Sequence, residues 1–365
     1  MKILLVGGGS GGSVSPLLAV AKHILKTRSK AEFLFVGSKN GPEQKMTQND
    51  GIKFIAVTSG KWRRYFSWKN FAVPFLIVIG FVESFKVLKS FQPDCIFGTG
   101  SFVQVPVVWA AWFLKIPVVL HQQDAALSLA NKLCELCAAK ITVTFAQSAK
   151  NFSTGLGIFY KKHPGDKLTV TGNPFREELR AADKGEAQKF FHLKTDLPTL
   201  LVLGGGTGAE FFNTLILDCL PQLTKTVQII HSTGGRGKIQ PSIYENYHSY
   251  DFIQNMAGAY AAADIVLARA GLSTLTELSN LRKLSIIVPM PQSHQELNGL
   301  LLIHSEAAIV LNQKRITPAG FVALIRKLLF AQEAQNILKH NIGQIMPHEA
   351  NEKISEIIYK LTESM

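Results

Sequence analysis

Short apolar runs alternate with longer segments of mixed polarity along almost the whole chain. Short apolar runs that end in glycine are typical of buried parallel strands, and the amphipathic segments between them are typical of helices. In the first half, this pattern predicts strands at 2–6, 33–36, 95–97, 117–120 and 141–144 and helices at 16–26 and 106–114. The predicted fold class is therefore α/β with a parallel sheet.

The same order of elements restarts near residue 198. Strands are predicted at 199–203, 227–231, 252–253, 265–268 and 285–288, with a helix through Asn213 and Leu220. The stretch 171–174 separates the two halves, because helices do not run through such a turn-rich sequence. We therefore expect an N-terminal domain of residues 1–172, a C-terminal domain of residues 173–340, and a final amphipathic helix within residues 341–365.

The positive charge of the chain indicates an anionic partner but does not show which kind. The 365 residues include 39 Lys and Arg against 26 Asp and Glu, a formal net charge of +13, although only 18% are charged. A hydrophobic content of 47% excludes intrinsic disorder as the main state. Such a positive chain binds either nucleic acid or an anionic membrane surface. Four Cys do not make a secreted disulfide scaffold, and the lone pair Cys134 and Cys137 is expected to be ordinary buried thiols.

The two apolar runs that could suggest a membrane segment, Ile3 to Val6 and residues 71–82, are both too short. The apolar run from Ile3 to Val6 is too short for the core of a signal peptide. The longest apolar stretch, residues 71–82, contains Pro74 and Gly80 and is shorter than the roughly 20 residues that a spanning helix needs. We therefore expect no transmembrane helix and a cytoplasmic protein.

Three glycine loops follow predicted strands, at residues 7–12, 98–100 and 204–208. Glycine lets the backbone approach a ligand closely, and the N-terminus of the following helix attracts anionic oxygen. The first loop has the spacing of a dinucleotide fingerprint, but no acidic residue ends the second strand, and a phosphate-loop lysine is absent. Tight turns also need glycine for structural reasons. Three such loops at strand ends nevertheless predict a cleft that binds phosphates.

The second half adds polar groups to this prediction. Arg269 follows a predicted strand, and Glu277 lies on the next helix. Glu277 either accepts both hydroxyls of a ribose or is an ordinary solvated helix residue. The sequence contains no Asp-x-Asp pair, so we predict no metal site and no cofactor. Helix N-termini and nearby cations would then neutralise a leaving diphosphate.

An ordered set of motifs covers almost the whole chain. They are Gly8 to Gly12 with Pro16, 61–65 (KWRRY), Pro93 with Asp94, 98–102 (GTGSF) with Pro106, 121–124 (HQQD), 171–174 (TGNP), 204–206 (GGG), 269–271 (RAG) with Glu277, and His294 and Gln295 with Asn298. Together they resemble the MurG family of glycosyltransferases. The resemblance implies a GT-B fold, with two Rossmann-like parallel-sheet domains facing a central cleft, and a C-terminal helix that crosses back to the first domain.

The activity that the resemblance implies is an inverting transfer of GlcNAc from UDP-GlcNAc to the 4-hydroxyl of MurNAc in lipid I, undecaprenyl-pyrophosphoryl-MurNAc-pentapeptide. The product would be lipid II, which supplies peptidoglycan synthesis and so cell wall growth, cell shape and cell division. Two alternatives remain open. One is a UDP-GlcNAc 2-epimerase with the same fold, and the other is a catalytically silent nucleotide-sugar binder.

The resemblance also implies the residues of two binding sites. The donor site would use Arg176, Gly205, Gly206, Thr207, Ile253, Asn255, Met256, Arg269, Glu277, His294 and Gln295. The acceptor site would use Gly9, Ser10, Gly11, Gly12, Thr99, Gly100, Ser101, Phe102 and Asp124. His121 and Asp124 would line the cleft between the domains.

Some positions depart from the family pattern. Ser13 stands where the family usually has a histidine that is a candidate general base, and serine is a poor base at neutral pH. The family's His-Glu-Gln-Asn is His121-Gln122-Gln123-Asp124, and Gly206-Thr207 replaces a Ser-Gln pair. The candidate catalytic residues are therefore Ser13, His121 and Asp124, of which Asp124 could substitute as the base.

Basic and aromatic residues alternate just before the longest apolar stretch. The residues expected to contact an anionic membrane surface are Trp62, Arg63, Arg64, Phe66, Trp68, Phe71, Phe75, Leu76 and Ile79. Interleaved cations and aromatic rings beside an apolar run are typical of an interfacial anchor. The alternatives are packing in the core or stacking on nucleic acid. A polyprenyl-linked acceptor favours the membrane anchor. We therefore predict a peripheral protein at the cytoplasmic face of the cell membrane, with no nucleic-acid partner.

Overall fold

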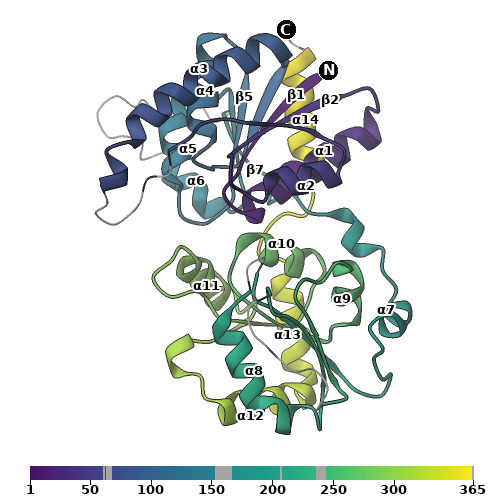
Figure 1. Cartoon of the computed structure of the whole chain (residues 1–365). Helices are drawn as coiled ribbons and strands as arrows, with labels where there is room; N and C mark the ends of the chain where they lie inside the picture. The colour runs from purple at the N-terminus through teal and green to yellow at the C-terminus, as the bar shows by residue number, and fades with distance from the viewer. Residues whose placement is uncertain (61, 63–67, 153–166, 206–207, 236–243, 364–365) are drawn as a thin grey trace. The chain divides into compact units, whose positions relative to one another are not determined.

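The computed structural model describes residues 1–60, 62, 68–152, 167–205, 208–235 and 244–363. The chain folds into two compact units. Unit 1 is Met1–Phe175 together with Met346–Met365, and unit 2 is Arg176–Ile345. Each unit contains its own parallel sheet with helices packed on it (Figure 1).

Unit 1 is built on a seven-stranded sheet in the order β3-β2-β1-β4-β5-β6-β7. The strands are β1 (Lys2–Val6), β2 (Glu32–Gly37), β3 (Lys53–Ala56), β4 (Cys95–Gly98), β5 (Val118–Gln122), β6 (Lys140–Val143) and β7 (Leu168–Val170). The helices are α1 (Gly11–Thr27), α2 (Glu43–Asn49), η1 (Trp68–Asn70), α3 (Val73–Phe91), α4 (Gln104–Phe113), α5 (Leu129–Cys134), η2 (Glu135–Cys137), α6 (Ala146–Phe152) and α14 (Ala350–Glu363). Every neighbouring pair of strands is parallel.

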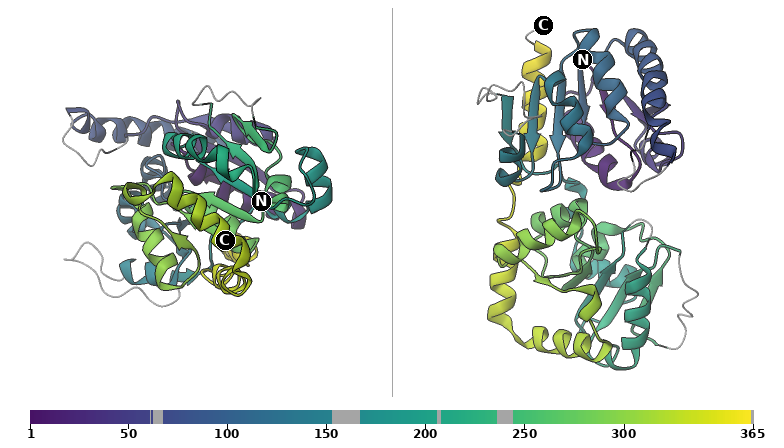
Figure 2. Two further views of the ribbon diagram at one scale, coloured as in Figure 1. Left: turned by 90° about the horizontal axis from the view of Figure 1, so that it is seen from below. Right: turned by 90° about the vertical axis from the view of Figure 1, so that its left-hand side faces the viewer.

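Two apolar layers sandwich this sheet. Residues of α4 and α5 bury one face of the strands, with α3 packed against them, and residues of α1 and α14 bury the other (Figure 2). On α14, Ile354 and Ile358 are completely buried. Near its end, Glu363 pairs at 2.5 Å with Arg28, the residue that follows α1, and the Arg28 guanidinium lies over the Tyr359 ring. The final helix is therefore part of the core of unit 1.

Unit 2 repeats the plan with a six-stranded sheet in the order β10-β9-β8-β11-β12-β13. The strands are β8 (Thr199–Leu203), β9 (Gln228–Ser232), β10 (Tyr247–Tyr250), β11 (Ile265–Ala268), β12 (Ser285–Ile287) and β13 (Ile309–Val310). The helices are η4 (Glu177–Arg180), α7 (Lys184–Phe190), α8 (Glu210–Leu223), α9 (Met256–Ala262), α10 (Leu272–Asn280), α11 (Gln295–His304), η6 (Gln313–Arg315), α12 (Pro318–Phe330) and α13 (Gln332–Ile342). The α/β class with two parallel sheets is confirmed.

One predicted strand is wrong. Phe252 lies in a bend and Ile253 in irregular structure, and the strand near this place is β10, Tyr247–Tyr250. Because β10 is at the edge of the sheet, most of its residues are only half-buried, and its Tyr-His-Ser-Tyr sequence carries no apolar run. The apolar pair Phe252 and Ile253 instead follows the strand, with Ile253 buried and Phe252 65% exposed.

Strand order places the candidate loops of each unit together. In unit 1 the order reverses between β1 and β4, and in unit 2 between β8 and β11. Ligands of parallel α/β sheets bind outside the carboxyl ends of the strands at such a switch point. The loops at 7–12 and 98–102 follow β1 and β4, and the loops at 204–208 and 269–271 follow β8 and β11. No described helix is long and apolar enough to cross a membrane.

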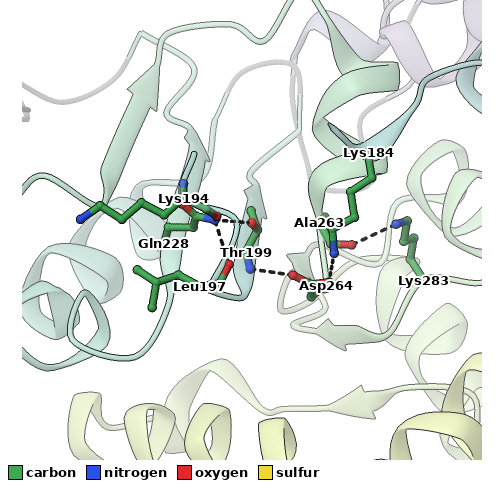
Figure 3. A network of polar contacts seen from close by, with 8 residues as sticks. All are labelled: Lys184, Lys194, Leu197, Thr199, Gln228, Ala263, Asp264 and Lys283. Atoms are coloured by element: carbon green, nitrogen blue, oxygen red, sulfur yellow. Dashed lines mark hydrogen bonds and ion pairs between the residues drawn. The ribbon is translucent and has the colours of Figure 1, made fainter. Parts of the chain in front are cut away.

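A polar network joins the amino ends of the central strands β8 and β11 of unit 2 (Figure 3). Asp264 accepts a hydrogen bond from the backbone N–H of Thr199 at 2.9 Å and pairs with Lys184 at 2.6 Å. Lys283 donates to the Ala263 carbonyl at 2.9 Å. Burial lowers the pKa of Lys283 to about 8, and nearby Asp264 only partly offsets that effect.

Lys283 gives the protein a measurable dependence of stability on pH. Its folded-state pKa is below the ordinary value of 10.5, so between about pH 8 and 10.5 the unfolded chain holds a proton that the folded chain has released. The free energy of unfolding therefore rises with pH in this window, by about 1–2 kcal/mol between pH 7.5 and 9.5. Urea unfolding of the wild type and Lys283→Met across this range should show a difference that changes by that amount. Parallel pH curves would contradict a lowered pKa.

Candidate functional site

The second glycine loop of unit 1 is hydrogen-bonded to the first turn of α1 and to the loop after β5. The Thr99 hydroxyl donates to the Ser13 carbonyl at 2.6 Å, and the Gln123 side chain donates to the Thr99 carbonyl at 3.2 Å. The first turn of α1 contains no acidic residue. Its N–H groups can therefore face an anion without repulsion from a carboxylate within that turn.

A chain of buried side-chain amides is hydrogen-bonded to the glycine loop at 98–102. Gln104 accepts from the Gly100 N–H and donates to Asn131, both at 2.7 Å. Asn131 in turn donates to Gln122 at 2.8 Å, and Gln122 donates to the carbonyls of Asp124 and Ala126. Sequence reasoning missed Gln104 and Asn131, because a buried amide gives no periodic signal. The network fixes the loop after β4 relative to the loop after β5.

Ser101 is the exception within this loop. Its side chain is 8% exposed, and its hydroxyl has no hydrogen-bond partner among the described residues. A buried hydroxyl without a partner costs free energy, so it needs an explanation such as a ligand, an ion or a water molecule that it would contact. Ser101 is therefore the open hydrogen-bonding group of the second loop, at a position where the sequence predicted acceptor contacts. Phe102 packs beside Gly9 and brings the two loops into contact.

Unit 2 contains a pocket of about 650 Å³ at the carboxyl ends of β8 and β11. It is lined by Gly204, Gly205, Gly208, Ala209, Glu210, Phe211, Thr214, Arg269, Gly271, Thr274, Met290, Gln295 and Gln313. Gly208 has a positive φ of 71°, and a Cβ there would lie 2.1 Å from the Thr233 carbonyl oxygen, so only glycine fits. The predicted donor residues Gly206 and Thr207 lie outside the described residues.

Arg269 is the only cation among the described residues that line this pocket. Its guanidinium donates to the Val288 carbonyl at 3.1 Å and to the Gln313 side chain at 2.8 Å. It also lies over the Phe212 ring, 4.7 Å from the centroid. Burial lowers the pKa of Arg269, but an arginine remains charged at every physiological pH. The fold therefore holds one oriented positive charge beside the glycine loop.

Glu277 lies outside the residues that line the pocket and pairs with Arg176. Glu277 Oε1 accepts from Arg176 Nη2 at 2.6 Å and from Nε at 3.2 Å, and Oε2 accepts from the Tyr260 hydroxyl at 2.6 Å. Burial alone would lower the pKa of Arg176, but the Glu277 carboxylate outweighs burial and raises it. A carboxylate offers about four acceptor positions, and three are filled. These contacts leave about one acceptor position on the Glu277 carboxylate, and the predicted contact with a ribose stays a prediction.

The other predicted donor residues are distributed around unit 2. Gln295 accepts from the Met290 N–H at 3.0 Å and lines the pocket, whereas His294 precedes α11 and is half-buried. Asn255 caps α9 by accepting from the Gly258 N–H, and it lines a second cavity of about 670 Å³. Met256 begins α9 and is half-buried. In the described part of the chain, no group of three His, Cys, Asp or Glu could hold a metal ion.

Comparison with known proteins identifies the family. Residues 3–143 match the glycosyltransferase family 28 N-terminal domain, and residues 199–355 match the glycosyltransferase family 28 C-terminal domain. A Clostridium botulinum (strain Langeland) protein is 32% identical over 368 residues, covering 99% of each chain. It is named UDP-N-acetylglucosamine--N-acetylmuramyl-(pentapeptide) pyrophosphoryl-undecaprenol N-acetylglucosamine transferase. The chain belongs to glycosyltransferase family 28 and, within it, to the MurG family.

Solved structures confirm the predicted GT-B class of the MurG family. MurG from Acinetobacter baumannii matches with a TM-score of 0.71 at 22% identity, covering 98% of this chain and 99% of that one. A UDP-GlcNAc 2-epimerase from Neisseria meningitidis bound to UDP-GlcNAc matches with a TM-score of 0.68 at 15% identity, covering 99% of this chain and all of that one. Both likenesses concern the fold, which transferases and epimerases share.

Ser13, at the usual histidine position of the MurG family, has a structural role in this chain. Its hydroxyl lies 3.0 Å from both the Gly8 and Ser10 carbonyls and donates to them. The single hydroxyl proton is thus already engaged within the loop. Ser13 shapes the turn into α1, and its geometry gives no support to a role as general base.

His121 is enclosed within unit 1. Its ring is completely buried, Nδ1 lies 2.9 Å from the Thr142 hydroxyl, and Nε2 lies 2.9 Å from the Asn173 side-chain oxygen. Burial lowers the pKa of His121 to about 4, although the Asn173 contact raises it in part. A neutral imidazole with both nitrogens engaged cannot reach a substrate. Asp124 is half-buried in the loop after β5 and is the remaining candidate base of the three.

Proposed function

We propose that this chain transfers GlcNAc from UDP-GlcNAc to the 4-hydroxyl of MurNAc in lipid I, with inversion at the anomeric carbon. The observation that carries this proposal is the unit 2 pocket, which places a glycine loop, the Arg269 cation and the Gln295 amide around one space. The names of the relatives support UDP-GlcNAc as the donor and the undecaprenyl-linked sugar as the acceptor. The product would feed peptidoglycan synthesis, and through it cell shape and cell division.

In the proposed reaction, the acceptor oxygen forms a bond to the anomeric carbon while the bond from that carbon to the β-phosphate oxygen breaks. The departing oxygen takes the electron pair, so negative charge develops on UDP. Arg269, held by Gln313 and Phe212, would offset this charge from a fixed position. The acceptor proton passes to a base, for which we propose Asp124. The Gly9–Gly12 and Thr99–Phe102 loops would hold the acceptor diphosphate.

The test is release of UDP from UDP-GlcNAc, with and without a lipid I analogue. Release that depends on the acceptor, with a disaccharide product, supports the transferase. Epimerised sugar without acceptor would support a UDP-GlcNAc 2-epimerase instead. Binding of UDP-GlcNAc with neither product would indicate a silent nucleotide-sugar binder.

We also propose that unit 1 binds an anionic membrane surface through an apolar face of η1, α3 and α4. The exposed side chains of this face are Trp68, Phe71, Phe75, Val78, Ile79, Val82, Trp112 and Phe113. Leu76, predicted with them, is half-buried, and Trp62 is 53% exposed. The predicted contacts Arg63, Arg64 and Phe66 lie outside the described residues.

Charge on the same helix supports a membrane partner. Lys86 and Lys89 of α3 are exposed, whereas Glu83 is held by the backbone N–H and hydroxyl of Thr58. Soluble proteins rarely expose such contiguous apolar surface without a partner. An apolar patch with cations beside it is attracted to anionic lipid. The proposed location is peripheral, at the cytoplasmic face of the cell membrane.

Replacing Phe75 and Ile79 together with serine should weaken binding to anionic vesicles at least tenfold. Each exposed side chain that enters lipid is worth about 1.5–3 kcal/mol at most, and about 1.4 kcal/mol is tenfold in affinity. The matched control is Leu297→Ser with Ile303→Ser on α11, where the two side chains are 49% and 50% exposed. Co-sedimentation with phosphatidylglycerol vesicles at low salt measures both. Equal binding by the two double variants would disprove the α3 surface.

A further inference from the structure

We propose that Glu43 is a positioning residue that sets the shape of the first glycine loop for the acceptor diphosphate. This inference rests on the proposed function, because it concerns the acceptor side of that reaction. Glu43 begins α2, and its side chain is completely buried. A buried carboxylate is costly unless donors surround it, so its presence behind a loop of glycines needs a structural reason.

The donors around Glu43 come from two loops. The Ser38 backbone N–H donates to Glu43 Oε1 at 2.7 Å, and the Ser38 hydroxyl donates to the same oxygen. The Gly9 N–H is directed at both carboxylate oxygens, 3.4 Å from each. Glu43 therefore joins the loop after β1 to the residue that follows β2. Gly9 and Glu43 are 34 residues apart in the sequence.

Three glycines make the space that the carboxylate occupies. A Cβ on Gly8 would lie 2.4 Å from Glu43 Oε1, and a Cβ on Gly41 would lie 1.8 Å from Oε2. A Cβ on Gly37 would lie 2.6 Å from the Glu43 Cγ. Real Cβ atoms essentially never approach this closely, so a side chain at any of these three positions would displace the Glu43 carboxylate or its neighbours. Gly8 thus leaves room for the Glu43 carboxylate.

The consequence concerns the direction of one peptide group. The Gly9 N–H is turned inward to a fully buried side chain, so it is not a donor to a ligand in this conformation. The chain then passes through Gly9 at a φ of 82° and enters α1 at Gly11. Fixing the Gly9 peptide fixes the path into α1, and with it the position of the N–H groups of the first helical turn. Those groups are the ones that an acceptor diphosphate would meet.

Glu43→Gln separates this role from a general effect on folding. The amide oxygen can keep the place of Oε1 and its contacts with Ser38, whereas the amide nitrogen would present a donor to the Gly9 N–H. We expect the KM for a lipid I analogue to rise about tenfold, with the KM for UDP-GlcNAc unchanged and kcat changed less than threefold. A purely electrostatic role predicts the opposite, because removal of a negative charge near a diphosphate would lower the acceptor KM.

The matched control is Thr47→Val in the same helix. Thr47 is also completely buried, and its hydroxyl donates to the Glu43 carbonyl at 2.9 Å without contact to the loop. Both variants should lower the melting temperature by a similar small amount, but only Glu43→Gln should change the acceptor KM. An unchanged or lowered acceptor KM in Glu43→Gln would overturn the proposal.

A second measurement does not depend on turnover. Hydrogen exchange of the amides of residues 7–14, without substrate, should be at least tenfold faster in Glu43→Gln than in the wild type and unchanged in Thr47→Val. If the wild type shows no acceptor-dependent UDP release but exchange responds as expected, the proposed function fails, and with it the link to an acceptor, whereas the control of the loop conformation by Glu43 stands. If exchange is unchanged in Glu43→Gln, the positioning role fails whatever the activity.

Discussion

Glu277→Gln should weaken both the stability of unit 2 and its affinity for UDP. The variant leaves the half-buried Arg176 guanidinium without its anionic partner, and one of the two acceptor oxygens that serve Arg176 and Tyr260 becomes a donor. Breaking a buried ion pair by removing one partner costs about 3–5 kcal/mol, which partial exposure of Arg176 reduces to about 2–3 kcal/mol here. We expect UDP affinity to fall at least tenfold, because the remaining acceptor position for a ribose hydroxyl loses its negative charge.

Urea unfolding and calorimetric titration with UDP measure the two effects separately. The matched control is Glu186→Gln, which breaks the exposed pair with Lys189 in the same unit and should change neither quantity. A stability loss with unchanged UDP affinity would show that Glu277 is only structural. A loss of affinity at unchanged stability would show that the contact with Arg176 contributes little in solution.

The sheet order explains which strands could be predicted from the sequence. The interior strands β1, β4, β8 and β11 are buried on both faces, so each is a continuous apolar run. The strands that the sequence did not predict at their observed positions are β3, β7, β10 and β13, which are the edge strands of the two sheets. Residues of these edge strands are partly exposed, and their sequences alternate only weakly between apolar and polar residues. An edge strand is therefore not recognisable as a continuous apolar run.

Some residues of the candidate sites could likewise be predicted from the sequence, and others could not. Glycine loops and Arg269 could be predicted because they follow strand ends in the sequence, and the structure places them at the switch points. Glu43, Gln104 and Gln313 could not be predicted, since each acts through a partner brought near only by folding. Gln313, for example, contacts Arg269 across 44 residues of sequence. Polar residues of this kind have no period along the chain, and their role depends on tertiary structure.

The identity of the general base gives the largest expected effect on turnover. Ser13 donates its hydroxyl within the loop, His121 is completely buried, and the Glu43 side chain is completely buried too. Asp124, which is half-buried, is therefore the proposed base. Asp124→Asn keeps the size of the side chain but cannot accept a proton. General base catalysis contributes about 10²- to 10⁴-fold, so kcat should fall by at least 10² while the KM values change less than threefold.

Two further variants make the result for Asp124 specific. Asp124→Glu keeps the carboxylate and should lose less than tenfold in kcat. Asp50→Asn removes a carboxylate elsewhere in unit 1, where Asp50 pairs with Lys22 at 2.9 Å, and should leave kcat unchanged. Full turnover by Asp124→Asn in the acceptor-dependent UDP assay would dismiss Asp124. The base would then be a group other than these three candidates, because Ser13 donates its hydroxyl within the loop and both ring nitrogens of His121 are engaged.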